Sequence, residues 1–408
     1  MKKFKRTISI IIMMTLFAAM LAGCGSGGKT DKLVLALRSG TYAEVIKECI
    51  PGFEEKYGIT CEVVEFSEDE LHSELLNDSV NRKGSYDIGM VDGSWVAEFY
   101  NDQIMTDLTA LGYSFDDDII PATTTICKYE GSTYLVPYYG NVTVMLYNRT
   151  VAEDLGFDNN NSFGSLDDIL KFCKASGASG HGGFVARGDT ENNVVVDFLP
   201  ILRAFGGWVV DENNNPIVDT PEFKKALNYY IELLGTGDLM VKDDLISSIE
   251  SGNEAVAVGW PGWYSVDSVN SDYISFPGRV DGSSESFNSN IYGIWTLGIT
   301  DNCKDKESAL LLLEYLMDPE VQKDTVSIGG VPCRYSCLTD PELVAANPHL
   351  EVICSALENG IYRPVIQEWT DFYSILGDKM IKIINGEITV DNGLMLAQEE
   401  LEAMMNTK

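Results

Sequence analysis

The chain has 408 residues, more than one compact hydrophobic core usually holds, so two lobes or domains are expected. Its 62 acidic and 29 basic residues give a formal net charge of −33, and a field of that sign repels nucleic acid and anionic lipid headgroups. The apolar fraction of 45 % is ordinary for a globular protein, and no repeat of 20–50 residues indicates a solenoid.

The amino-terminal segment has the pattern of an export signal. Basic residues near the start precede the apolar run TISIIIMMTLFAAMLAG, which ends at Cys24. The pattern resembles a bacterial lipoprotein signal, so we expect a signal peptide at 1–23, a lipid on the Cys24 thiol and a flexible tether at 24–31. A membrane-spanning helix is the alternative, but the run is short for a span of about 20 residues. The lipid would hold the protein at the extracellular face of the cell membrane.

Strand and helix patterns alternate after the tether. Strands are expected at 32–40, 59–66 and 86–93, with amphipathic helices at 41–58 and 69–84 between them. Short links between such elements imply right-handed crossovers and a parallel sheet covered on both faces. In sheets of this kind ligands lie beyond the carboxyl ends of the strands.

The second half of the chain continues with mixed elements. Two strand-like runs flank PYYGN, and Ser165 and Thr220 are expected to cap helices that end at Gly177 and Gly235. Further helices are expected at 306–317, 318–327, 371–385 and 390–406.

The order of these segments resembles the bacterial extracellular solute-binding proteins of the maltose-binding-like group (family 1), the substrate receptors of ABC importers. The lipobox, YDIGMVDGSWVAEFY, YLVPYYGNVTVMLYN, GNEAVAVGWPGWY and YRPVIQEW carry the resemblance over nearly the whole mature chain. It implies an α/β fold of two lobes (the type II periplasmic-binding-protein fold), each a mostly parallel sheet flanked by helices, with three interlobe crossings.

The resemblance also implies where the lobes begin and end. We expect the N-terminal lobe at 31–138 plus 293–326 and the C-terminal lobe at 139–292 plus 327–408. A solute would be trapped between them by hinge closure and passed to the permease subunits by a monomeric receptor.

Three aromatic residues after Gly259 are the first candidates for ligand contact: Trp260, Trp263 and Tyr264. A sugar ring has an apolar C–H face that an indole matches, and in relatives an aromatic near this loop stacks on the sugar. The alternative is that these rings fill a core.

Other candidates lie at predicted strand ends, at the lobe crossings and on a late helix. Their polar groups would bind sugar hydroxyls, and their rings would add stacking surface. Each also has a structural alternative, namely a helix cap, a surface ion pair or core packing. These candidates are Arg38, Asp92, Trp95, Tyr138, Tyr139, Asn141, Arg363, Trp369 and Tyr373. Asn141 departs from the pattern of the relatives and leaves the ligand chemistry open.

No metal and no cofactor are expected. Eight cysteines remain besides Cys24, without a C-x-x-C pair and with only three histidines, so a zinc site is improbable, and the thiols are either paired or buried and free. The acidic stretch from Asp211 to Glu222 fits a calcium loop except at Pro216, where such a loop needs glycine.

The sequence thus predicts a receptor for a carbohydrate, with an oligosaccharide as the favoured ligand, and no enzyme. No G-x-S-x-G, H-E-x-x-H or P-loop motif is present, and with 62 acidic residues a carboxylate pair carries no information. The alternatives are the same fold with a non-sugar solute, such as a polyamine or a peptide, and a secreted carbohydrate-active enzyme.

Overall fold

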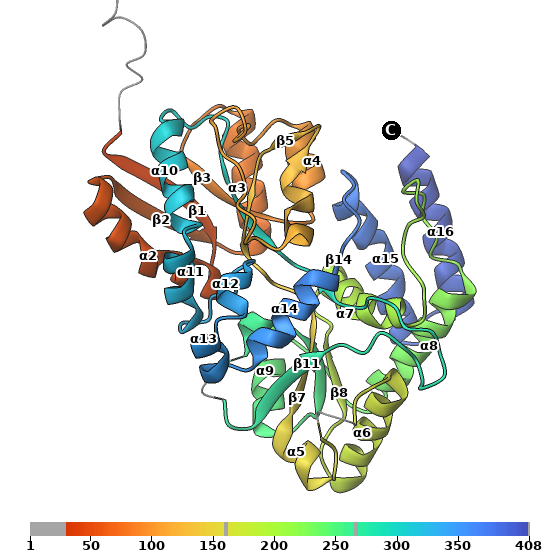
Figure 1. Cartoon of the computed structure of the whole chain (residues 1–408). Helices are drawn as coiled ribbons and strands as arrows, with labels where there is room; N and C mark the ends of the chain where they lie inside the picture. Colours follow the sequence, from red (N-terminus) through yellow and green to blue (C-terminus); the bar gives the residue numbers. More distant parts are fainter. Residues whose placement is uncertain (1–29, 159–161, 265–267, 407–408) are drawn as a thin grey trace, which may run out of the picture.

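The computed structural model describes residues 30–158, 162–264 and 268–406, which form two lobes, one above the other in Figure 1. The signal peptide and the lipidated Cys24 predicted from the sequence lie outside the described residues. Within the described residues, no helix combines the length and the apolar character that crossing a membrane requires.

A five-stranded sheet forms the centre of the first lobe. Its strands stand in the order β2 (Thr60–Phe66), β1 (Lys32–Arg38), β3 (Ile88–Asp92), β13 (Trp295–Ile299) and β6 (Val136–Tyr139). β1 pairs in parallel with β2 and β3, whereas β13 is antiparallel to both β3 and β6. One reversed strand therefore lies inside a sheet whose other strands share a direction. The strands expected at 32–40, 59–66 and 86–93 are confirmed as its three parallel members.

Helices and a short hairpin surround this sheet. α2 and α3 supply the two crossovers expected from the sequence, and α10 and α11 pack beside α2. The elements are α2 (Thr41–Tyr57), α3 (Glu68–Val80), α4 (Val96–Asn101), the 3₁₀ helix η1 (Pro121–Cys127), β4 (Lys128–Tyr129), β5 (Ser132–Thr133), α10 (Lys306–Leu316) and α11 (Pro319–Val326).

The second lobe repeats the same plan. Its sheet has the order β11 (Ser271–Ser275), β7 (Val144–Asn148), β10 (Val256–Gly259), β8 (Phe184–Arg187) and β9 (Leu239–Met240). β10, β8 and β9 are parallel, and β7 is the reversed strand between β10 and β11. Both lobes thus have mixed sheets in which one direction dominates, in agreement with the fold predicted.

Seven helices of the described chain belong to the second lobe. They are α5 (Arg149–Asp154), α6 (Leu166–Ser179), α7 (Glu191–Ala204), α8 (Pro221–Leu234), α9 (Lys242–Ser251), α15 (Trp369–Ile384) and α16 (Val390–Asn406). The predicted caps are correct, because the Ser165 side chain accepts a hydrogen bond from the backbone N–H of Asp168, and Thr220 accepts one from Phe223. The end expected at Gly177 is wrong: α6 continues two residues further, to Ser179, and is capped by Gly180 in the left-handed conformation.

In the described residues the chain passes between the lobes three times: between β6 and β7, between β11 and β13, and between α11 and α15. β12 (Ile291–Tyr292) and β14 (Ile361–Tyr362) form a small parallel sheet on two of these passages. The third also carries α12 (Tyr335–Leu338), α13 (Pro341–Ala346) and α14 (His349–Asn359). α14 contacts both η1 and β11, so it touches both lobes (Figure 1).

The eight cysteines of the described chain are all free thiols, and seven are buried while Cys61 is partly exposed. This resolves the choice that the sequence left open. Burial raises the pKa of the thiol groups, for example to about 11 at Cys49, so these side chains behave as small apolar residues in the two cores.

One carboxyl group in the second lobe is buried without a full set of partners. Glu254 is 7 % exposed and lies just before β10, against Gly182 and Gly237, and its Oε2 has no hydrogen-bond partner among the described residues. Burial, followed by repulsion from Asp238, raises the pKa of Glu254 to about 7. The folded protein therefore holds a proton that the unfolded chain releases.

Replacing Glu254 by Gln should change how stability depends on pH. Because the folded-state pKa of Glu254 is raised, the wild-type loses stability as pH rises from about 4.5 to 7, and the loss is complete above 7. We expect Glu254→Gln to have a higher free energy of unfolding than wild type at pH 8, by at most about 3 kcal/mol, and no advantage near pH 4.5. Thermal melts at both pH values test this. An equal difference in stability between variant and wild type at both pH values would contradict the prediction. Glu153→Gln, at an exposed position, is the control.

Candidate ligand-binding site

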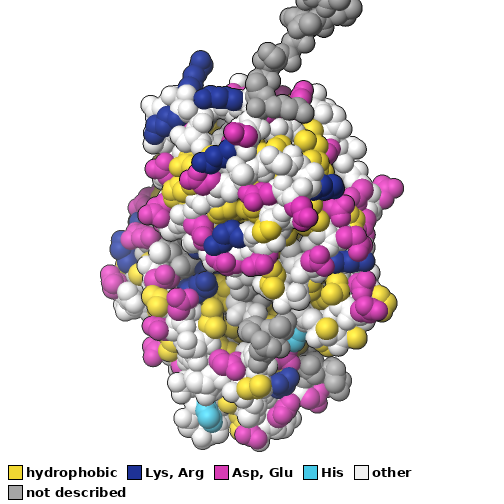
Figure 2. Space-filling view, turned by 90° about the vertical axis from the view of Figure 1, so that its left-hand side faces the viewer, with side chains coloured by type: hydrophobic (Ala, Val, Ile, Leu, Met, Phe, Trp, Pro, Cys, Tyr) yellow, Lys and Arg dark blue, Asp and Glu magenta, His cyan; other side chains and the backbone are white. Residues whose placement is uncertain are grey.

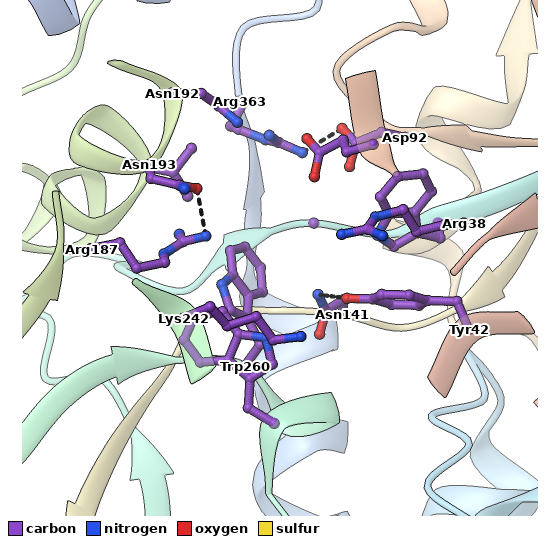
Figure 3. Close-up of a pocket in the computed structure, with 15 residues that line it drawn as sticks. Arg38, Tyr42, Asp92, Asn141, Arg187, Asn192, Asn193, Lys242, Trp260 and Arg363 are labelled. Atoms are coloured by element: carbon purple, nitrogen blue, oxygen red, sulfur yellow. Dashed lines mark hydrogen bonds and ion pairs between the residues drawn. The ribbon is translucent and has the colours of Figure 1, made fainter. Parts of the chain in front are cut away.

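A cavity lies between the lobes, where the carboxyl ends of β1 and β3 face α7, α9 and the loop after β10 (Figure 3). It contains about 560 Å³ of space not filled by protein atoms, part of it open to solvent. Its walls are Arg38, Tyr42, Glu68, Asp92, Asn141, Arg187, Asn192, Asn193, Val196, Lys242, Trp260, Trp263, Gly293, Trp295 and Arg363.

The charge of the cavity differs from that of the chain. On the face shown in Figure 2, acidic side chains are spread over the surface and do not gather in one patch. The cavity instead collects four basic side chains, Arg38, Arg187, Lys242 and Arg363, against the carboxyl groups of Glu68 and Asp92. Figure 3 shows the four basic side chains pointing into the same space.

Arg187, at the carboxyl end of β8, is held by a buried carboxylate. Its Nε lies 3.1 Å and 3.2 Å from the two carboxylate oxygens of Asp197, which is fully buried on α7, and its Nη1 donates to Asn193 Oδ1 at 2.6 Å. The guanidinium carbon lies 5.0 Å from the ring centroid of Trp263, a cation–π distance. Asp197 thus neutralises the charge of Arg187, and the planar guanidinium group packs against the ring of Trp263.

Arg363 and Asp92 form the second buried ion pair. Arg363 Nη2 lies 2.5 Å from Asp92 Oδ1, and the same oxygen accepts hydrogen bonds from Ser94 N at 2.8 Å and Ser94 Oγ at 2.6 Å. Asp92 ends β3 in the first sheet, and Arg363 follows β14 on the third passage between the lobes. The pair therefore ties the first lobe to that passage.

The remaining charged groups of the cavity have no ion-pair partner within 4.0 Å among the described residues: Arg38, Lys242 and Glu68. Arg38 Nη1 donates only to its neighbour Ser39, at 2.8 Å to Oγ. Burial and then the charge of Asp92 raise the pKa of Glu68. Burial lowers the pKa of Lys242, which Asp243 opposes, and Arg38 and Arg187 lower it further.

Polar atoms without partners point to a polar ligand. Arg38 Nε, Asn141 Oδ1 and Asn192 Oδ1 are buried and have no hydrogen-bond partner among the described residues. An unpaired buried polar group costs roughly 1–3 kcal/mol, so these atoms favour a ligand that supplies both donors and acceptors. Asn141 Nδ2 is used in the protein, since it donates to Tyr42 Oη at 3.3 Å.

Aromatic rings form one wall of the cavity. Trp260 is 6 % exposed, and its ring lies over Gly293, where a Cβ would stand 2.6 Å from the indole. Trp263 is partly exposed in the 3₁₀ turn after β10. Trp295, at the start of β13, packs on Tyr42 with ring centroids 5.4 Å apart. These rings offer a flat apolar surface beside the unpaired polar atoms.

The structure distributes the twelve candidates from the sequence over several places. Six line the cavity: Arg38, Asp92, Asn141, Trp260, Trp263 and Arg363. Two line a neighbouring hollow that shares Glu68 and Asn192 with the cavity: Trp95 and Tyr373. Tyr264 lies in a third hollow, against His349, with ring centroids 4.7 Å apart.

The other three candidates lie in the core. Tyr138 and Tyr139 are 4 % and 1 % exposed because both faces of β6 are covered, and Tyr139 Oη donates to the backbone oxygen of Gly329 at 2.7 Å. Trp369 is 1 % exposed and stacks on Phe372, with ring centroids 5.4 Å apart, because it begins α15 against α7. These three side chains do not line the cavity.

Sequence reasoning missed seven polar or aromatic residues of the cavity: Tyr42, Glu68, Arg187, Asn192, Asn193, Lys242 and Trp295. Arg187 ends a strand just as Arg38 does, so the same rule would have found it. Asn192 and Asn193 were missed with their helix, because α7 contains three successive valines and Pro200, which are unfavourable in a helix.

A comparison with protein families matches residues 49–352 to the family described as bacterial extracellular solute-binding protein. The chain belongs to this family, as the resemblance in its sequence implied. A curated relative is a probable amino-acid ABC transporter periplasmic-binding protein of Sinorhizobium fredii. It is 22 % identical over 405 residues, which cover 96 % of this chain and 92 % of the relative.

Solved structures share the fold. T. maritima MalE3 with bound maltose has a TM-score of 0.80 and 23 % identity, covering 91 % of this chain and 99 % of its own. An Agrobacterium radiobacter solute-binding protein in complex with ribitol has a TM-score of 0.81 and 22 % identity, covering 91 % and 98 %. The GacH receptor of Streptomyces glaucescens, solved with acarbose, has a TM-score of 0.80 and 20 % identity, covering 93 % and 99 %. Each confirms the two-lobed architecture.

Removing Arg363 should destabilise the protein because it leaves the buried Asp92 carboxylate without its cation. We expect Arg363→Met to lower the free energy of unfolding by about 3 kcal/mol, and the double variant with Asp92→Asn to recover most of that loss. Thermal and urea unfolding of the two single variants and the double variant measure the coupling. If the losses of the two single variants add up to the loss of the double variant, the ion pair itself contributes nothing to the free energy of unfolding.

Proposed function

We propose that the protein is a lipid-anchored receptor that captures a carbohydrate at the extracellular face of the cell membrane and passes it to an ABC permease. The observation that carries this proposal is the cavity itself. It places Trp260 and Trp263 beside unpaired polar atoms of Arg38, Asn141 and Asn192. Rings bind the apolar face of a sugar, and the polar atoms pair with its hydroxyl groups.

Several considerations support this proposal. Proteins of the same fold have been solved with maltose, ribitol and acarbose, which are all polyhydroxyl compounds. The lipobox before Cys24 supports the lipid anchor and the extracellular location. The same proposal includes the lobe boundaries expected from the sequence, a monomeric state and no covalent chemistry.

A second candidate solute is an amino acid. The relative from Sinorhizobium fredii is named as a probable amino-acid transporter component. In the cavity, Arg38 and Glu68 lack ion-pair partners, and they are the groups that an α-carboxylate and an α-ammonium would require. A polyamine fits less well, because it would meet four basic side chains.

A thermal-shift screen of residues 26–408 separates these candidates. We expect a mono- or oligosaccharide at 100 times its dissociation constant to add about 2.7 kcal/mol to the stability of the folded state. Amino acids and a polyamine form the comparison sets. A shift with an amino acid or the polyamine and with no saccharide would reject the carbohydrate assignment.

Trp263→Ala tests the stacking surface. The variant should weaken binding of the solute found in the screen by roughly 1–3 kcal/mol while the melt of the ligand-free protein changes little, because the ring is partly exposed. Trp208→Ala is the matched control, since Trp208 is also partly exposed but stacks on Arg203 outside the cavity. A large loss of ligand-free stability in Trp263→Ala would show that this ring belongs to the core.

A further inference from the structure

The cavity holds basic side chains that the protein itself does not neutralise. Two of its four cations have buried carboxylate partners, since Arg187 pairs with Asp197 and Arg363 with Asp92. Arg38 and Lys242 have no such partner within 4.0 Å among the described residues. These two groups therefore line the cavity without a salt bridge to the protein, and Lys242 is exposed to solvent there, in a chain whose net charge is −33.

The two unneutralised cations come from different lobes. Arg38 ends β1 in the first lobe, and Lys242 begins α9 in the second (Figure 3). Both line the same cavity; burial lowers the pKa of Lys242, Asp243 opposes this, and the charge of Arg38 lowers it further. Like charges held together in a partly dehydrated space repel each other, and an anion placed between them removes that repulsion.

Glu68 does not take the place of such an anion. It is the first residue of α3 and forms no ion pair with Arg38 or Lys242 within 4.0 Å. Burial raises the pKa of Glu68, as does the charge of Asp92, whereas the charges of Arg363, Arg38 and Arg187 lower it.

We propose that the solute is an acidic sugar, whose carboxylate or phosphate group binds between Arg38 and Lys242. This inference rests on the proposed function and names the class of carbohydrate. Arg38 supplies Nε, a buried donor without a partner, and a guanidinium fork suited to an oxyanion. The unpaired oxygens of Asn141 and Asn192 would accept hydrogen bonds from ring hydroxyls, and Trp263 would cover the apolar face.

Pairs of sugars that differ in one group test the proposal. We would titrate the full-length chain in detergent by calorimetry with D-glucose and D-glucuronate, with D-galactose and D-galacturonate, and with maltose and digalacturonate. D-Glucose 6-phosphate distinguishes a phosphate from a carboxylate source. The acidic member of a pair should bind at least tenfold more tightly, and its affinity should fall as salt is raised.

Variants of Arg38 and Lys242 test whether these two side chains bind the acidic group of the sugar. Lys242→Met should weaken binding of the acidic sugar by roughly tenfold to a hundredfold and change binding of the neutral partner less than about threefold. Arg38→Met also removes a donor to hydroxyl groups, so it should weaken both members of a pair, the acidic one at least tenfold more than the neutral one. Lys174→Met removes an exposed lysine on α6, outside the cavity, and should change neither affinity. Circular dichroism and melting temperature show whether each variant is folded.

The outcomes separate this inference from the proposed function. If neutral and acidic sugars bind equally, or if Lys242→Met weakens both members of a pair to the same extent, the acidic-sugar inference is overturned while the carbohydrate receptor stands. If no saccharide of either kind binds, the carbohydrate assignment is overturned and the inference with it.

Discussion

Unbalanced positive charge between the two lobes is the constraint on which the site depends. Strand ends in both sheets deliver basic groups to one partly dehydrated space, and each group needs a counter-charge to remain there at low cost. Asp197 and Asp92 supply it for two arginines; Asp197 also accepts a hydrogen bond from the backbone N–H of Arg187, and Asp92 accepts hydrogen bonds from Ser94. Arg38 and Lys242 have no such ion-pair partner within 4.0 Å among the described residues, so the cleft presents two cations that are not engaged in salt bridges.

Most of the fold followed from local patterns and from the order of segments. The parallel strands of the first sheet, the caps at Ser165 and Thr220 and the late helices are all encoded within a few residues of the positions they occupy. What the sequence did not reveal depends on distant contacts. α7 forms despite Pro200 because it is buried against α15 and α8, and packing outweighs propensity there.

The site was only partly predictable for the same reason. Strand ends such as Arg38 and Asp92 are local features that a sheet places at a known edge. Whether a tryptophan faces a cleft or a core is decided by elements far away in the chain: Trp263 remains partly exposed, whereas Trp369 is covered by α7. The charge partners likewise come from distant segments, since Asp92 and Arg363 are 271 residues apart.

Helix α14 has a consequence for how the halves can move. Its first residue, His349, bonds to Asp272 on β11, and Leu357 near its end accepts a hydrogen bond from Tyr292 and lies against Gly140 at the passage between the lobes. The helix is thus held near both of its ends and lies where an axis of movement between the lobes would run. A rotation of one lobe against the other about this helix would move atoms near α14 least and atoms at the far edge of the cleft most, so a small angle would open the cleft widely.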